Sequence, residues 1–160
     1  SPTNAFNILQ GIETLSVRMD KHLSNAKKML QYLSNHDGVA WVTHPDHPDH
    51  PDHKIAKKIL PKGSGSMIAF GVKGGRVAGE AFINAVSLAS NLANVGDAKT
   101  LVIHPASTTH AQMDVETMKL AGLTEDMIRF SVGIEDIEDI INDFENGFRA
   151  ASKPRLVANQ

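Results

Sequence analysis

The sequence contains no cysteine, which excludes disulfide bonds, thiolate zinc sites and thiol nucleophiles. It has no excess of basic residues either, because Lys and Arg number 16 against 18 Asp and Glu. The broad basic face that nucleic acid or an anionic membrane would require is therefore not expected. No apolar run approaches the roughly 20 residues of a membrane span, and no signal-peptide pattern opens the chain. We predict a cytoplasmic protein without nucleic-acid or membrane partners.

What is present is typical of one globular domain: 160 residues, of which 41% are hydrophobic and 21% charged. From Thr3 to about Asn35, apolar residues recur at helical spacing with no proline inside, which predicts one long helix over 1–35. A helix of about 45 Å exceeds the needs of a small domain, so we expect it to reach toward another domain. The segment 152–160 contains Pro154 and little periodicity, and it is predicted to be a loose tail.

The remaining segments alternate between strand and helix patterns over 36–151. Strands are expected in GVAWVTHP, which mixes β-branched and aromatic residues between turn formers, and in SMIAFGV, LASNLAN, TLVIHP and IRFSVG. Helices are expected over 54–60, in GGRVAGEAFINAV and DVETMKLAG, and in a final segment ending near Arg149. The order predicts a two-layer α/β (α+β-like) domain over 1–151, with a small sheet covered by helices largely on one face.

The stretch HPDHPDHPDH, from His44 to His53, is a tandem repeat of a His-Pro-Asp unit. Imidazole and carboxylate are common ligands for zinc, copper and nickel, so a metal-binding module is one hypothesis. In a polyproline-like helix, however, residues three apart lie about 9 Å from one another, too far for one ion to bridge. The alternative is an exposed, mobile and solvated loop, and our site prediction includes no metal ligand.

Two other segments carry polar groups suited to chemistry. HPASTTH, from His104 to His110, places two histidines beside three hydroxyls, but short Ser/Thr clusters usually cap helices or close turns. Arg129 alternates with the apolar Ile128 and Phe130, so it lies on the opposite strand face from them. A guanidinium there either grips a carboxylate in a bidentate manner or forms an ordinary surface ion pair.

Three stretches carry a family resemblance. SPTNAFNILQGIETLSVRMDKH, SLASNLANVGDAKTLVIHPASTTH and IRFSVGIEDIEDIINDF together resemble the C-terminal domain of the Cys/Met-metabolism pyridoxal-phosphate (PLP) enzymes. LANVGDAKTLVIHPASTTH and PKGSGSMIAF are similar to the forms found in the O-acetylhomoserine sulfhydrylase branch. The resemblance implies the small C-terminal domain of the aspartate-aminotransferase-like fold (PLP fold type I). The HPDHPDHPDH stretch departs from the family pattern.

The resemblance also implies site residues. Arg129, with Ser131, Gly133 and Glu135, matches the family's R-x-S-x-G-x-E pattern, whose arginine grips the α-carboxylate of the substrate. A polar residue ahead of a glycine turn assists this arginine in the related lyases. The matching position here is Asn91 or Ser90.

The implied parent enzyme is a PLP-dependent transferase of methionine biosynthesis. It replaces the acetate of O-acetylhomoserine with sulfide or a thiol, and PLP serves as the electron sink. The family's Schiff-base lysine lies in a preceding domain, which this chain does not include, so we expect the fragment alone to bind no PLP and to be inactive. The expected partners are that N-terminal PLP domain and further copies in a homotetramer. The alternatives are a non-catalytic scaffold or oligomerisation domain, and a cystathionine synthase or lyase of the same family.

Overall fold

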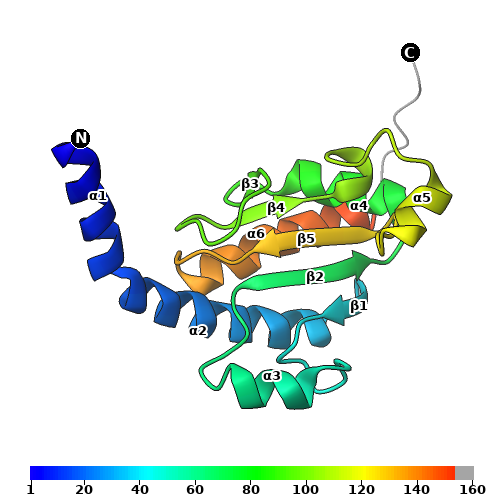
Figure 1. Cartoon of the computed structure of the whole chain (residues 1–160). Helices are drawn as coiled ribbons and strands as arrows, with labels where there is room; N and C mark the ends of the chain where they lie inside the picture. Colours follow the sequence, from blue (N-terminus) through cyan, green and yellow to red (C-terminus); the bar gives the residue numbers. More distant parts are fainter. Residues whose placement is uncertain (154–160) are drawn as a thin grey trace.

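The computed structural model describes residues 1–153, so most of the predicted 152–160 tail lies outside the described residues. The chain opens with two helices, α1 (Pro2–Glu13) and α2 (Leu15–Ser34), where the sequence predicted one. Thr14 separates them, with φ −96° and ψ 0°, and Figure 1 shows α1 turned away from the axis of α2. The predicted single helix is therefore wrong at this position.

Side chains near the break bond the last carbonyls of α1. Thr14 Oγ1 donates to the Gln10 carbonyl at 3.3 Å, and Arg18 donates from its guanidinium to the Gly11 carbonyl at 2.6 Å. A threonine that bonds back by four residues bends a helix. α1 buries no residue and α2 buries six, so only α2 packs on the body of the domain.

Five strands form one mixed sheet in the order β1-β2-β5-β4-β3. These strands are β1 (Val39–Thr43), β2 (Met67–Val72), β3 (Ser90–Asn91), β4 (Leu101–Ile103) and β5 (Met127–Ser131). Neighbouring strands are antiparallel except β3 and β4, which run parallel. The strand predicted near Leu88 is reduced to the two residues of β3. The central strands are thus β2, β5 and β4.

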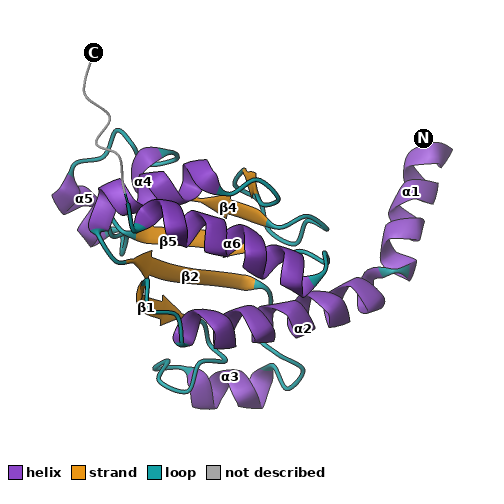
Figure 2. Cartoon of the chain, turned by 180° about the vertical axis from the view of Figure 1, so that it is seen from behind, coloured by secondary structure: helices purple, strands orange, loops and turns teal. Residues whose placement is uncertain are grey.

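The helices α2, α4 (Gly75–Ala85) and α6 (Ile137–Ala151) cover a single face of this sheet (Figure 2). The alternating residues of β2 and β5 that face them are fully buried. Five phenylalanines pack edge to face or tilted within this core: Phe70, Phe82, Phe130, Phe144 and Phe148. The predicted two-layer architecture is confirmed, and the other sheet face is left to loops.

Three short elements complete the chain: α3 (His53–Ile59), a 3-10 turn (Pro105–Ser107) and α5 (Val115–Leu120). Asp114 caps α5 by accepting a hydrogen bond from the Thr117 amide, and Asp136 caps α6 at the Glu138 amide. Over the described residues, no helix combines the length and the apolar character needed to cross a membrane.

Candidate functional site

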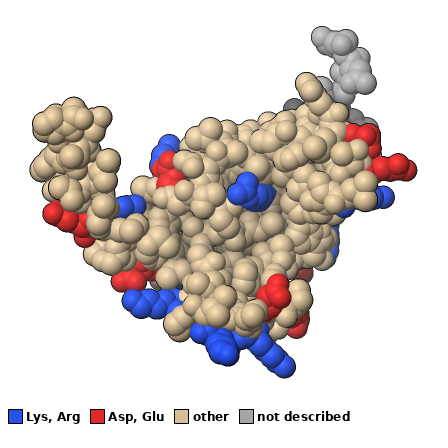
Figure 3. Space-filling model, viewed as in Figure 1, with Lys and Arg blue, Asp and Glu red and all other residues tan. Residues whose placement is uncertain are grey.

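Arg129 lies at the centre of the sheet, on the face away from the three long helices. It pairs with Ala69 of β2 and Ile103 of β4, whereas its neighbours Ile128 and Phe130 are fully buried against the helices. Arg129 is the only Lys or Arg in the five strands. Figure 3 shows an isolated basic patch within uncharged surface over the middle of this face. The strand alternation therefore presents a single cation on an open, largely uncharged surface.

The guanidinium of Arg129 is half-buried and unpaired within residues 1–153. The ion pairs there are formed by His36, His44 and Arg76, and no hydrogen bond of the Arg129 side chain is found. The alternative of an ordinary surface ion pair is thus not supported by the described part of the chain. A half-buried guanidinium without an internal acid is suited to bind an external carboxylate through two parallel hydrogen bonds.

The loop before β4 folds against the end of β5 beside Arg129. Ser131 faces the same side of the sheet as Arg129, and its hydroxyl accepts a hydrogen bond from the Gly96 amide at 3.2 Å. Gly96 has φ +74°, a left-handed backbone angle that suits glycine. Glycine is a typical turn residue, but no local pattern in the sequence indicates that this turn reaches a residue 35 positions away.

The strand register distinguishes the two predicted helpers of Arg129. Ser90 pairs with Leu101, which in turn pairs with Ser131, so Ser90 shares the open face with Arg129. Asn91 pairs with Val102, which in turn pairs with Phe130. Asn91 therefore faces the helical side of the sheet, and it is exposed because β3 is an edge strand. β3 lies two strand spacings from β5, about 10 Å away. Of the two positions, Ser90 is the better placed to act with Arg129.

The HPASTTH segment does bring a histidine and a serine together. The Ser107 hydroxyl lies 2.7 Å from Nδ1 of His104, and the other ring nitrogen, Nε2, donates to the Glu125 carbonyl at 2.8 Å. The partner of the imidazole is thus a backbone carbonyl instead of a carboxylate, and His104 is fully buried. A substrate therefore cannot reach this pair. Its hydrogen bonds connect the 104–107 segment with the loop that contains Glu125.

The His-Pro-Asp repeat is folded into consecutive turns, and Pro48, Asp49, Pro51 and Asp52 are exposed, as expected for a loop. In each unit the amide of the aspartate donates to Nδ1 of the histidine two residues earlier, at 3.1, 3.3 and 3.1 Å. Each histidine carbonyl also accepts from the next histidine's amide. His53 closes the loop through Nδ1 to the Pro45 carbonyl at 2.8 Å. Each unit is therefore a turn stabilised by its own side chain.

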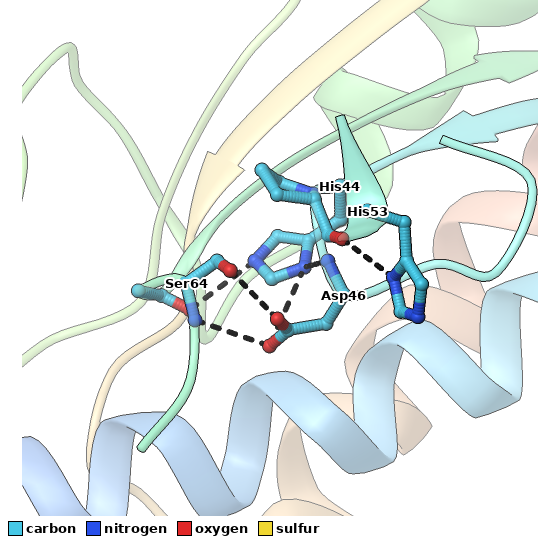
Figure 4. Close-up of polar contacts among 6 residues, drawn as sticks. His44, Asp46, His53 and Ser64 are labelled. Carbon is cyan, nitrogen blue, oxygen red and sulfur yellow. Dashed lines mark hydrogen bonds and ion pairs between the residues drawn. The ribbon is translucent and has the colours of Figure 1, made fainter. Parts of the chain in front are cut away.

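The first unit anchors the loop to the segment that leads into β2 (Figure 4). Asp46 accepts hydrogen bonds from the hydroxyl and the amide of Ser64, at 2.6 and 3.1 Å. The buried His44 donates from Nε2 to the Gly65 carbonyl at 3.3 Å. Burial alone would raise the pKa of Asp46, but the bonds from Ser64, with His44 and His53 nearby, lower the pKa of this carboxyl.

These groups resemble a serine-histidine-acid set in composition but not in connection. The Ser64 hydroxyl donates directly to Asp46, whereas in a hydrolase the serine donates to the histidine. His44 Nδ1 lies 3.9 Å from the Asp46 carboxylate and already accepts the Asp46 amide, so the imidazole is neutral. Among the described residues, no three His, Asp or Glu side chains converge as ligands for a metal ion. The arrangement is that of a structural anchor.

We expect the free energy of unfolding to fall as the pH is lowered from about 7 to about 5.5. Burial lowers the pKa of both His44 and His104 below the ordinary value of about 6.5. The unfolded chain therefore takes up protons more readily, so this stability is full above about pH 6.5 and is lost below it. Urea unfolding at several pH values measures the effect.

The variant His44→Gln serves as the control for this pH dependence, because an amide retains a donor for the Gly65 carbonyl without titrating. Its free energy of unfolding should depend less steeply on pH than that of the wild type. A wild-type chain that becomes more stable on acidification through this range would contradict the prediction.

Comparison with known proteins gives a consistent result over almost the whole chain. The family described as Cys/Met metabolism PLP-dependent enzyme matches residues 1–149. Homocysteine synthase of Schizosaccharomyces pombe is 50% identical over 151 residues, which cover 94% of this chain and 35% of that protein. O-acetyl-L-homoserine sulfhydrylase of Corynebacterium glutamicum is 46% identical over 150 residues, covering 94% and 34%. The chain thus spans about a third of the length of these curated relatives.

Solved structures agree with the fold. Cystathionine gamma synthase from Xanthomonas oryzae pv. oryzae, in complex with cystathionine, matches with a TM-score of 0.85 and 35% identity, over 97% of this chain and 40% of that one. A putative O-acetylhomoserine (thiol)-lyase from Campylobacter jejuni matches with a TM-score of 0.84 and 35% identity, over 93% and 35%. The resemblance inferred from the three sequence stretches is confirmed.

Proposed function

Because the chain belongs to the family of Cys/Met metabolism PLP-dependent enzymes, we propose that it is the substrate-carboxylate-binding domain of an O-acetylhomoserine sulfhydrylase. The parent enzyme would exchange the acetate of O-acetylhomoserine for sulfide or a thiol. The identities of 50% to a homocysteine synthase and 46% to an O-acetyl-L-homoserine sulfhydrylase support this branch of the family.

One observation carries the proposal for this domain: Arg129 is half-buried on the open face of the sheet, and its guanidinium has no partner within residues 1–153. The antiparallel neighbours β2 and β4 fix the backbone of Arg129 on both sides. The role of Arg129 is to bind the α-carboxylate and thereby to orient the rest of the substrate. Ser90 is proposed to assist from the same face, and Asn91 is the less favoured position.

The described residues do not fit a PLP site of their own. Every lysine is exposed on a helix or loop, whereas the lysine that holds PLP has to lie in an enclosed pocket. The family is PLP-dependent. We therefore assign the lysine and the other PLP contacts to the part of the parent protein that lies outside this chain, and we expect the chain alone to be inactive.

The first helix supplies a surface for that missing part. Phe6, Ile8, Leu9 and Ile12 of α1 are each about 60% exposed, and none of the α1 residues is buried. A cluster of large apolar side chains of this kind marks a protein interface. We propose that α1 packs on the N-terminal PLP domain within a tetrameric parent enzyme.

The test compares this chain with the full-length protein that contains it. Both are mixed with PLP, O-acetylhomoserine and sulfide, and the visible absorbance of bound PLP and the yield of homocysteine are measured. Only the longer protein is expected to bind PLP and to form homocysteine. A full-length protein that binds no PLP would contradict the enzyme assignment and favour a scaffold role.

A second candidate follows from the match to cystathionine gamma synthase, which is as close in structure as the match to the thiol-lyase. In this case cysteine takes the place of sulfide as the nucleophile. Running the same assay with cysteine distinguishes the two, because only a cystathionine synthase would then form cystathionine faster than homocysteine forms from sulfide.

A further inference from the structure

Thr100 connects three backbone segments at the end of the sheet where Ser131 lies. Its amide donates to Glu135 Oε1 at 2.6 Å and its hydroxyl donates to Glu135 Oε2 at 2.8 Å. The same hydroxyl accepts a hydrogen bond from the Gly133 amide at 2.9 Å. Thr100 is fully buried and Glu135 is partly buried, so these bonds are shielded from water on the side of Thr100. We call Thr100, Gly133 and Glu135 the Thr100 clamp.

The segments that the Thr100 clamp joins are also in direct backbone contact. The Ile134 amide donates to the Ala98 carbonyl at 2.9 Å, which adds a backbone bond between the same two segments. Gly133 has no room for a side chain, because a Cβ there would lie 2.6 Å from the Ala98 carbonyl oxygen. The segment before β4 and the segment after β5 are therefore held in contact through backbone atoms.

Helix α2 supports the same segment from the opposite side. Asn25 donates from Nδ2 to the carbonyls of Gly133 and Glu135, at 3.0 and 2.9 Å. His22, one turn earlier, donates from Nδ1 to the Val132 carbonyl at 2.6 Å. Both side chains are 1% exposed. The residues after β5 are thus fixed between α2 and the clamp.

The position of this network gives it a functional consequence. Thr100 precedes β4, the strand that pairs with Arg129, and Ser131 follows Arg129 by two residues on the same face. Ser131 also accepts the Gly96 amide, so the 96–100 loop is attached at both of its ends to the β5 segment. These bonds therefore hold the 96–100 loop against the segment that carries Arg129.

Resting on the proposed carboxylate-binding role of Arg129, we infer that Thr100 and Glu135 are positioning residues for the substrate carboxylate. They act by holding the 96–100 loop against β5, so that Arg129 and the loop enclose one carboxylate. This assigns a role to the glycine and the glutamate of R-x-S-x-G-x-E. Gly133 permits the close backbone approach, and Glu135 binds the two donors of Thr100.

The test uses the full-length enzyme with PLP bound. Thr100→Val keeps the shape of the side chain but removes the hydroxyl, which is both the donor to Glu135 and the acceptor for Gly133. We expect its KM for O-acetylhomoserine to rise about tenfold, because a bond to a charged group is lost. The KM for sulfide and the absorbance of bound PLP should not change. Thr100→Ser, which keeps the hydroxyl, should stay within about twofold of wild type.

A second measurement separates positioning from a general loss of structure. It is the ratio of kcat/KM for O-acetylhomoserine to kcat/KM for its α-carboxamide, which lacks the charge that Arg129 binds. Misplacement of the carboxylate site should lower this ratio in Thr100→Val, whereas general destabilisation would reduce both values equally. If Thr100→Val does not fold, Glu135→Gln decides by the same ratio, since it keeps the shape of the side chain but removes the carboxylate that accepts both bonds from Thr100.

Arg129→Ala distinguishes failure of this inference from failure of the proposed function. If Arg129→Ala leaves the ratio unchanged, the carboxylate-binding role itself is wrong. If Arg129→Ala lowers the ratio but the deciding clamp variant keeps the wild-type ratio and KM, the positioning role is overturned.

Discussion

Replacement of Arg129 with alanine in the full-length enzyme should lower kcat/KM for O-acetylhomoserine by about a thousandfold. A bidentate guanidinium-carboxylate pair contains two charge-assisted hydrogen bonds, and loss of about 4 kcal/mol corresponds to three powers of ten. Arg129→Lys keeps the positive charge but loses the planar fork, so we expect a reduction of about tenfold to a hundredfold. Steady-state kinetics with varied O-acetylhomoserine measure both effects.

Arg149→Ala is a matched control for this result. Arg149 is exposed in the last turn of α6, on the helical side of the domain, away from the open sheet face. Its removal should leave kcat/KM unchanged within about twofold, since surface substitutions have small effects. If Arg129→Ala were no more harmful than Arg149→Ala, Arg129 would not bind the substrate.

The sequence predicted the elements whose pattern is local. β5 alternates Ile128 and Phe130 with Arg129, and the structure has that alternation, with the apolar pair buried and the arginine on the other face. Asp136 likewise has the short acidic side chain that is typical of a helix cap, and it caps α6 in the structure. Period and capping depend on neighbours within a few residues, so they are visible in one sequence.

Features that depend on side-chain bonds to the backbone were not visible. The break at Thr14 arises because its hydroxyl bonds the Gln10 carbonyl, in a segment whose apolar spacing continues unbroken. The His-Pro-Asp repeat folds into turns because Nδ1 of each of its first three histidines accepts a hydrogen bond from the amide two residues later, while composition predicted only an exposed, mobile loop. In both cases a hydrogen bond overrides the average preference of the residues.

The candidate site was predictable only through its family pattern. Arg129 was identified from R-x-S-x-G-x-E, and its strand face from the alternation with apolar residues. Only the folded structure shows that no acidic side chain pairs with Arg129 within residues 1–153. The partners Thr100 and Glu135 are 35 residues apart. No periodicity connects such positions, and strand order, which brings β4 beside β5, is not encoded locally.

Gly133→Ala should lower the free energy of unfolding of the 160-residue chain by about 3 kcal/mol. The added Cβ would lie 2.6 Å from the Ala98 carbonyl oxygen and still closer to the Thr100 amide nitrogen and Glu135 Oε2. Two of these three atoms belong to the backbone and cannot rotate away. Relief of the clash therefore requires separating the segments that Thr100 joins, which also breaks the bond from the Ile134 amide.

Gly11→Ala is the same chemical change with the opposite expected sign. Gly11 lies inside α1, and a Cβ there would meet no atom within 4 Å. Alanine is favoured over glycine within a helix, so this variant should be more stable by about 0.5 to 1 kcal/mol. Urea unfolding of both variants measures the difference. If Gly133→Ala were as stable as Gly11→Ala, the segments at Gly133 would separate to accommodate the added Cβ without loss of stability. The Thr100 clamp would then not be rigid.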